Sequence, residues 1–136
     1  MQADAEAARP GGFFACGRPL LVLDSITEAI GPGAGCVVVT GSHGGLSAGR
    51  FALQAQVYLA VFNDAGVGLQ QAGIAALALL QAHGIAACAV AHDTARIGDA
   101  ASTLASGVLS YVNAQAAALG ARPGLAVHSW LTPAPG

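Results

Sequence analysis

Short apolar runs alternate along most of the chain with longer segments rich in alanine and leucine. Each run contains valine and is bounded by glycine or polar residues, a pattern typical of buried strands. The runs cover residues 20–23, 36–40, 57–62 and 85–91. The segments 46–56 and 69–83 between them have the length and composition of helices. Continuous apolar strands that alternate with helices predict a parallel sheet covered on both faces.

Start and stop signals mark the remaining elements. Ser25 and Glu28 have the spacing of a capping box, which predicts a helix start directly after the first strand. Gly84 is expected to end the helix 69–83, and Gly120 to end one or two helices that run from the loop 92–99 to about residue 119. Residues 125–131 alternate enough to predict a further edge strand.

These elements predict one α/β domain with three layers and a mostly parallel sheet, of the Rossmann-like or flavodoxin-like kind. Its glycine-rich loops are expected at the carboxyl ends of the strands. The chain of 136 residues has the length of a single domain. The domain is expected over residues 13–131, with a disordered or extended tail at 1–12 and a second tail at 132–136.

The composition is poor in charge. Hydrophobic residues make up 54% of the chain and charged residues 9%, where about 25% charged is usual. A surface with so little charge is poorly soluble on its own, which predicts a homo-oligomer. The helix 69–83, apolar on nearly every side, is the expected subunit interface.

Several classes of function are excluded by the residues that are present. All 5 basic residues are arginine, so Schiff-base chemistry and the phosphate-binding lysine of a P-loop are excluded. A net charge of −2 without a basic cluster argues against nucleic acid as a partner. The sequence shows neither an apolar run of the roughly 18–20 residues that a membrane span needs nor a signal peptide, so we expect a cytoplasmic protein without a membrane partner.

The 3 cysteines lack the CxxC spacing of metal and redox sites. Cys36 and Cys88 lie at or inside apolar strands and are expected to be buried, reduced thiols. Cys16, close to the expected tail, is the one candidate for a reactive thiol.

Polar residues gather in the loops that follow the strands. Ligands of open parallel sheets bind outside the carboxyl ends of the strands. The loops 41–45, 63–68 and 92–99 occupy those positions and hold a large share of the scarce ionisable residues. These residues are His43, Asp64, His92, Asp93, Arg96 and Asp99. The expected ligand is therefore small and polar, and its charge is expected to be negative.

The first loop contains Ser42, His43, Gly44 and Gly45. Ser42 is a candidate nucleophile or hydroxyl donor, with a helix cap as the structural alternative. His43 is a candidate general base, with a solvated or backbone-bonded histidine as the alternative. Gly44 and Gly45 would let the backbone and the free N–H groups of a helix start approach an anion.

The second and third loops add carboxylates and an arginine. Asn63 and Asp64 follow a strand, where Asp64 is a candidate acid–base residue and an Asx turn is the alternative. Arg96 lies three residues from both Asp93 and Asp99. It is expected either to hold this loop through the two carboxylates or to bind a carboxylate or phosphate of the ligand. Asp99 has the further alternative of capping the next helix.

No known short motif names the chemistry, and the sequence leaves the cofactor open. The loops fit neither GxxxxGK[ST] nor GxGxxG nor GxSxG. A metal site built from His43, Asp64, His92 and Asp93 is a weaker alternative, because no pair has the spacing of a local metal motif.

The expected function is therefore an enzyme that acts on a small polar or anionic molecule by acid–base chemistry, as a hydrolase, lyase or isomerase. His43, Asp64 and Ser42 are the catalytic candidates. Gly44, Gly45, Asn63, Asp93, Arg96 and Asp99 are the ligand-binding candidates. A non-catalytic ligand-binding or regulatory subunit and a purely structural assembly protein are the alternatives.

Overall fold

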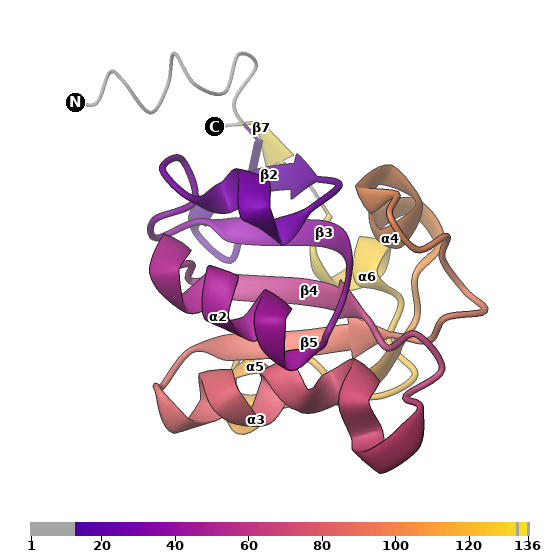
Figure 1. The fold of residues 1–136 in the computed structure, drawn as a ribbon. Helices are drawn as coiled ribbons and strands as arrows, with labels where there is room; N and C mark the ends of the chain where they lie inside the picture. Colours follow the sequence, from indigo (N-terminus) through magenta and orange to yellow (C-terminus); the bar gives the residue numbers. More distant parts are fainter. Residues whose placement is uncertain (1–12, 133, 136) are drawn as a thin grey trace.

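A mixed sheet of seven strands forms the centre of the protein, in the order β6-β5-β4-β3-β2-β1-β7 (Figure 1). This computed structural model describes residues 13–132 and 134–135, so the expected tail at 1–12 lies outside the described residues. The parallel strands are β2 (Arg18–Leu23), β3 (Val37–His43), β4 (Leu59–Asn63) and β5 (Ala86–Val90). The antiparallel strands are β6 (Leu109–Val112) beside β5, β1 (Phe13–Ala15) beside β2, and β7 (Ala134–Pro135) beside β1.

The parallel strands follow one another across the sheet in chain order, from β2 to β5. A doubly wound sheet reverses its strand order at the point where ligands bind. The sheet with its helices confirms the α/β class. Because the order of these four strands does not reverse, a Rossmann-like or flavodoxin-like topology is not confirmed.

Helices cover the two faces of the sheet in two groups (Figure 1). The segments that connect the parallel strands lie on one face, and the segments after β5 pack on the other. The first group contains η1 (Ile26–Ala29), α2 (Leu46–Ala55), η2 (Leu69–Ile74) and α3 (Ala75–Ala82). The second contains α4 (Ala100–Ser106), α5 (Ala114–Ala118) and α6 (Val127–Trp130). Right-handed connections between strands that advance in one direction place every connecting helix on the same face.

Alternate residues of each strand supply the two halves of the core. In β3, Val37 and Val39 face the α4–α6 side, and Val38 faces the α2–α3 side. Small residues bring α2 and α3 close together, because a Cβ added at Gly49 would lie 3.0 Å from the Cβ of Ala76. The high alanine content thus serves close packing between helices and sheet.

The end of β3 differs from the sequence-based expectation. Residues 41–43 were predicted as a loop, but β3 continues to His43, which pairs with Asn63 of β4. A register shift between Val39 and His43 interrupts the pairing. Thr40 bridges this irregularity, because its hydroxyl donates to the Val61 carbonyl at 2.9 Å and accepts from the Ser42 amide at 3.2 Å.

The predicted helix 69–83 begins instead as the 3₁₀ segment η2 and becomes helical at α3. Gln70 and Gln71 have φ angles of 54° and 59°, which break the helix before it is established. Gly84, with φ 74°, ends α3 as predicted.

Two predictions for the last third of the chain were wrong. Part of the expected helical region forms β6, because Gly107 ends α4 and the following residues pair with β5. The expected edge strand at 125–131 is instead mostly α6. The Val127 amide donates to the Gly107 carbonyl at 2.9 Å, after which the chain coils into this helix.

No helix among residues 13–132 is long and apolar enough to cross a membrane.

Candidate functional site

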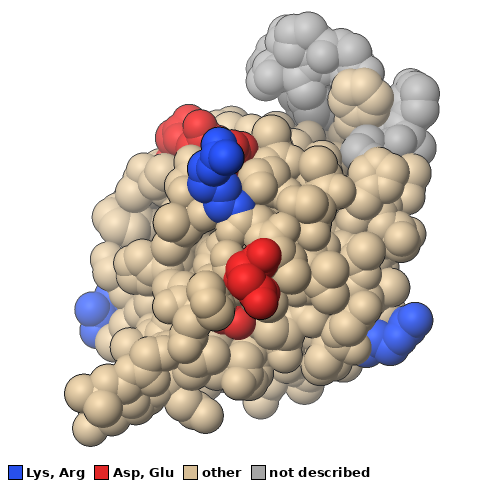
Figure 2. All heavy atoms as spheres, turned by 90° about the vertical axis from the view of Figure 1, so that its right-hand side faces the viewer, with Lys and Arg blue, Asp and Glu red and all other residues tan. Residues whose placement is uncertain are grey.

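The loops that follow β3, β4 and β5 lie together on the right of Figure 1, at the carboxyl edge of the parallel strands. Figure 2 shows this edge from the front. Most of its surface is uncharged, and acidic and basic side chains form only small, separate groups on it. The few ionisable groups at this edge are therefore the candidates for a catalytic or ligand-binding site.

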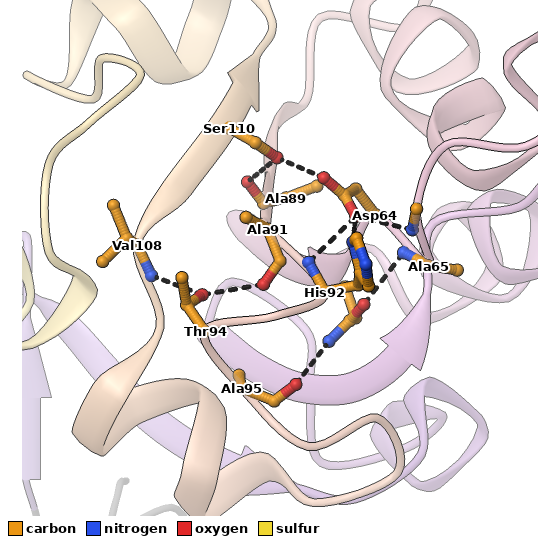
Figure 3. Close-up of polar contacts among 11 residues, drawn as sticks. Asp64, Ala65, Ala89, Ala91, His92, Thr94, Ala95, Val108 and Ser110 are labelled. Atoms are coloured by element: carbon orange, nitrogen blue, oxygen red, sulfur yellow. Dashed lines mark hydrogen bonds and ion pairs between the residues drawn. The ribbon is translucent and has the colours of Figure 1, made fainter.

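Asp64 is the centre of a polar cluster at the end of β4 (Figure 3). Its side chain is buried, and its Oδ1 accepts from the amides of Gly66 at 2.8 Å and His92 at 3.0 Å. Its Oδ2 accepts from the hydroxyl of Ser110 on β6 at 2.7 Å. The bond to Gly66 closes the Asx turn that the sequence offered as an alternative. One carboxylate thus fixes the ends of β4 and β5 to β6.

His92 places an exposed imidazole beside this buried carboxylate. Its Nδ1 lies 3.6 Å from Asp64 Oδ1, and 61% of its side chain is exposed. Gly66 lies against the ring, because a Cβ added there would be 3.7 Å from His92 Cε1 and Nδ1. The separation is an ion-pair distance and is longer than a hydrogen bond. A carboxylate on the Nδ1 side of an exposed imidazole orients a general base when this contact shortens on ligand binding.

Asn63 has a structural role. It is fully buried, its Nδ2 donates to the Ala95 carbonyl at 3.2 Å, and its Oδ1 accepts from the Ala65 amide at 2.8 Å. Both ends of the amide are therefore engaged in holding the loops after β4 and β5 together, and contact between Asn63 and a ligand stays a prediction.

Ser42 and His43 lie apart from Asp64, beside a cavity of about 170 Å³ between η1 and α2. Ser42 Oγ accepts from the Ile26 amide at 3.0 Å, so the hydroxyl supports the first residue of η1, whose N-cap is Ser25. His43 is exposed, and within the described part of the chain no hydrogen bond or ion pair joins it to Asp64. The partner of Asp64 is thus His92.

Gly44 and Gly45 both have a packing role. A Cβ at Gly44 would lie 2.8 Å from the Gly73 carbonyl oxygen and 3.3 Å from Phe62 Cβ, and a Cβ at Gly45 would lie 2.7 Å from His43 Cε1. The absence of side chains there lets the loop after β4 pack onto the start of α2. Contact between these glycines and a ligand stays a prediction.

The two glycines allow a matched test of this packing role. Gly44→Ala is expected to lower the free energy of unfolding by about 1–3 kcal/mol, because the backbone of Gly73 cannot move away cheaply. Gly45→Ala should cost less than about 1 kcal/mol, because the exposed His43 ring can turn aside. Urea unfolding measures both values. Equal losses in the two variants would contradict the packing argument.

The third loop uses its charges mainly to start α4. Asp99 caps this helix by accepting from the Ser102 amide at 3.0 Å, as one alternative predicted, and Asp24 accepts from the Ala100 amide at 2.9 Å. The Arg96 side chain is 82% exposed, and its Nη1 lies 3.9 Å from Asp99 Oδ2, which is a long ion-pair distance. Asp93 is exposed, and its side chain forms no hydrogen bond or ion pair with the other described residues. Arg96 therefore does not bridge Asp93 and Asp99, and most of its guanidinium faces solvent.

The cysteines are free thiols. Cys36 and Cys88 are buried, as predicted, and burial raises the pKa of the Cys88 thiol far above its usual range. Cys16 is exposed at the turn between β1 and β2, and desolvation raises the pKa of its thiol as well. A raised pKa keeps a thiol protonated at neutral pH, so these two cysteines lack the activation of a nucleophile.

The weaker alternative of a metal site gains no geometric support. Among residues 13–132, no three His, Cys, Asp or Glu side chains come together as metal ligands.

The sequence located Asp64 but missed its partners. The sequence indicates His92 only as an ionisable residue of the third loop and as a possible metal ligand, and it gives Ser110 no role because the pattern predicts a helix there. The alternation of Leu109-Ser110-Tyr111-Val112 after a helix-ending glycine is the signal that would have indicated β6.

Comparison of the chain with models of protein families, with curated proteins and with solved structures found no match.

Proposed function

We propose that this protein is a small cytoplasmic enzyme that acts on a small polar or anionic molecule by acid–base chemistry. The observation that carries the proposal is the exposed His92 imidazole beside the buried, hydrogen-bonded carboxylate of Asp64, 3.6 Å away. Hydrolysis, elimination and isomerisation are the reaction classes that such a pair serves. In this proposal His92 replaces His43 as the general base, and Asp64 orients it.

The geometry supports a specific division of roles. Asp64 is held by three hydrogen bonds, so its carboxylate stays in place while the His92 imidazole takes up and releases a proton. With Nδ1 directed to Asp64, Nε2 is the atom that takes a proton from the substrate or from water. The imidazolium formed in that step lies against the carboxylate, which stabilises its charge. Asp64 is thus a positioning residue.

Arg96 is the proposed anion-binding group. It lies on the loop that begins at His92, and its contact with Asp99 at 3.9 Å is long and exposed. An exposed ion pair of this kind contributes little to stability. The guanidinium is therefore free to form a bidentate pair with a carboxylate or phosphate of the substrate. Asp93 beside His92, and Ser42 and His43 at the cavity near α2, are further candidates for substrate contact.

A ligand-binding or regulatory subunit is the second candidate. Each of the three loops or helix starts at this edge exposes one large apolar side chain: Leu46 is 43% exposed, Leu69 85% and Ile97 52%. A partner that docked at this edge would bury these side chains. The proposal of a homo-oligomer fits the same observation, and in that case the site would face a second copy of the chain.

The test measures turnover of a panel of probes: nitrophenyl acetate, nitrophenyl phosphate, lactones and cyclic amides. We expect at least one probe to be turned over, and His92→Asn to lower its kcat by about 10²–10⁴-fold. His83→Asn is the matched control, because His83 is exposed and its ring Nδ1 contacts the Leu79 carbonyl at 3.0 Å, away from Asp64. Arg96→Ala should raise KM for anionic probes more than for neutral ones.

One result would contradict the assignment of His92, and another would contradict the enzyme. Turnover that survives His92→Asn but disappears in His43→Asn would place the active site at the cavity between η1 and α2. A thermal shift by a small carboxylate or phosphate that requires Arg96, without turnover of any probe, would favour the binding subunit.

A further inference from the structure

We propose that a groove between α3 and β6 is a second binding site, for a small uncharged carbohydrate. The groove has a volume of about 300 Å³ and is lined by ten residues from η2, α3 and β6 and by the N-cap of α5. This volume is at the lower end of the range for small-molecule sites. Neither Asp64 nor His92 lines the groove, so the proposal is independent of the proposed acid–base site.

Backbone strain is concentrated at the mouth of this groove. Gln70 and Gln71, which line it, are consecutive residues with φ angles of 54° and 59°. Residues with a Cβ rarely adopt this left-handed conformation, and glycine would avoid its cost. Ala65 and Val67 in the same connection also have positive φ angles. Strain of this kind clusters at ligand clamps, and here it presents two amide side chains at a groove.

The polar side chains that line the groove are neutral, and two of them, Gln81 and Asn113, already bind backbone groups. Among the described residues, the amides of Gln70 and Gln71 and the hydroxyl of Tyr111 have no hydrogen-bond partner. An amide presents a donor beside an acceptor, which matches two adjacent hydroxyls of a sugar ring. No charged side chain lines the groove, so nothing there would offset the desolvation of a charged ligand.

Apolar surface completes the match to a sugar. Ile74 and Ala78 line the groove on the side of α3, and Tyr111 is 39% exposed on the side of β6. A pyranose ring has C–H groups on its faces and hydroxyls around its edge. The aromatic ring and the aliphatic wall can therefore cover the faces while the amides bind the edge.

A peptide that adds to the sheet edge is the less suitable occupant. β6 is the terminal strand of the sheet, but it has only four residues. At one end of it, the Leu109 amide and carbonyl already bind Leu125 and Gly124, at 2.9 and 2.8 Å. Few backbone groups of β6 are left for a further strand, and recognition of an added strand depends on them.

The test titrates the intact protein with neutral monosaccharides and disaccharides in calorimetry and thermal-shift assays. We expect binding of at least one sugar, and the double variant Gln70→Gly with Gln71→Gly should weaken it by about tenfold or more. Because glycine relieves the strain, the Tm of this variant should not fall. Tyr111→Ala should weaken the same sugar without unfolding the protein.

Gln56→Gly is the matched control. Gln56 also has a left-handed backbone, with φ 58°, but it ends α2 and does not line the groove. It should leave sugar affinity unchanged, as should His92→Asn, which separates this site from the proposed acid–base site. The proposal is wrong if no neutral sugar binds, if affinity survives the double variant, or if an extended peptide binds in place of sugars.

Discussion

Replacing Asn113 with alanine is expected to lower the free energy of unfolding by about 3–5 kcal/mol, since the loss of a buried hydrogen-bond network is among the most damaging single changes. Asn113 is 5% exposed and uses its whole amide. Its Oδ1 accepts from the amides of Ala87 and Ala116, each at 3.0 Å. Its Nδ2 donates to the carbonyls of Leu77 and Ile85, at 3.2 and 2.9 Å. The side chain joins α3, β5 and α5.

Urea unfolding followed by circular dichroism measures this loss, and Asn113→Asp sharpens the test. Aspartate keeps the shape but replaces the two N–H donors with an oxygen that faces the Leu77 and Ile85 carbonyls. At neutral pH it should therefore destabilise the protein at least as much as alanine does. Gln54→Ala, an exposed change on α2, should cost less than about 0.5 kcal/mol. A loss in Asn113→Ala as small as that in Gln54→Ala would show that the amide does not hold these elements together.

Asp64→Ala is expected to cost about 2–4 kcal/mol of stability, because it leaves buried or half-buried donors without a partner. The amides of Gly66 and His92 and the hydroxyl of Ser110 lose their acceptor at once. The same change should remove any turnover that depends on His92, because the ring loses the group that orients it. Stability is measured by urea unfolding, and turnover is measured with any probe that the unmodified protein turns over.

Asp64→Asn separates the two effects of that change. Asparagine keeps Oδ1 for the Gly66 and His92 amides, and the Ser110 hydroxyl can rotate to accept from the new N–H group. We expect a stability loss of about 1 kcal/mol or less, together with a turnover close to that of Asp64→Ala. If Asp64→Asn keeps full turnover, the charge of Asp64 has no part in the chemistry and its role is confined to the Asx turn.

Ser110→Ala completes the comparison, because the Ser110 hydroxyl donates to the far oxygen of the carboxylate and to the Ala89 carbonyl. Its expected cost is about 1–1.5 kcal/mol. The cost should nearly vanish in an Asp64→Ala background, since contacting residues are not additive.

The sequence by itself determined the α/β class, the approximate positions of the parallel strands and the helix start at Ser25, and it offered Asp99 as one possible cap of the later helix. Valine-rich runs bury strands by their own composition, and the capping signals act within a few residues. The sequence also indicated that polar residues would follow the strands, because that pattern depends only on where each strand ends.

The tertiary structure alone decided which of these polar residues meet. The sequence offered His43 and Asp64 as acid–base candidates, but Asp64 lies beside His92. The Asp64 amide donates to the Val90 carbonyl at the end of β5, and Asp64 Oδ1 accepts from the His92 amide. Ser110 joins them through a short strand whose pairing depends on β5 rather than on its own residues. Contacts that connect distant segments follow from strand order and register, and neither is encoded in the local spacing of polar and apolar residues.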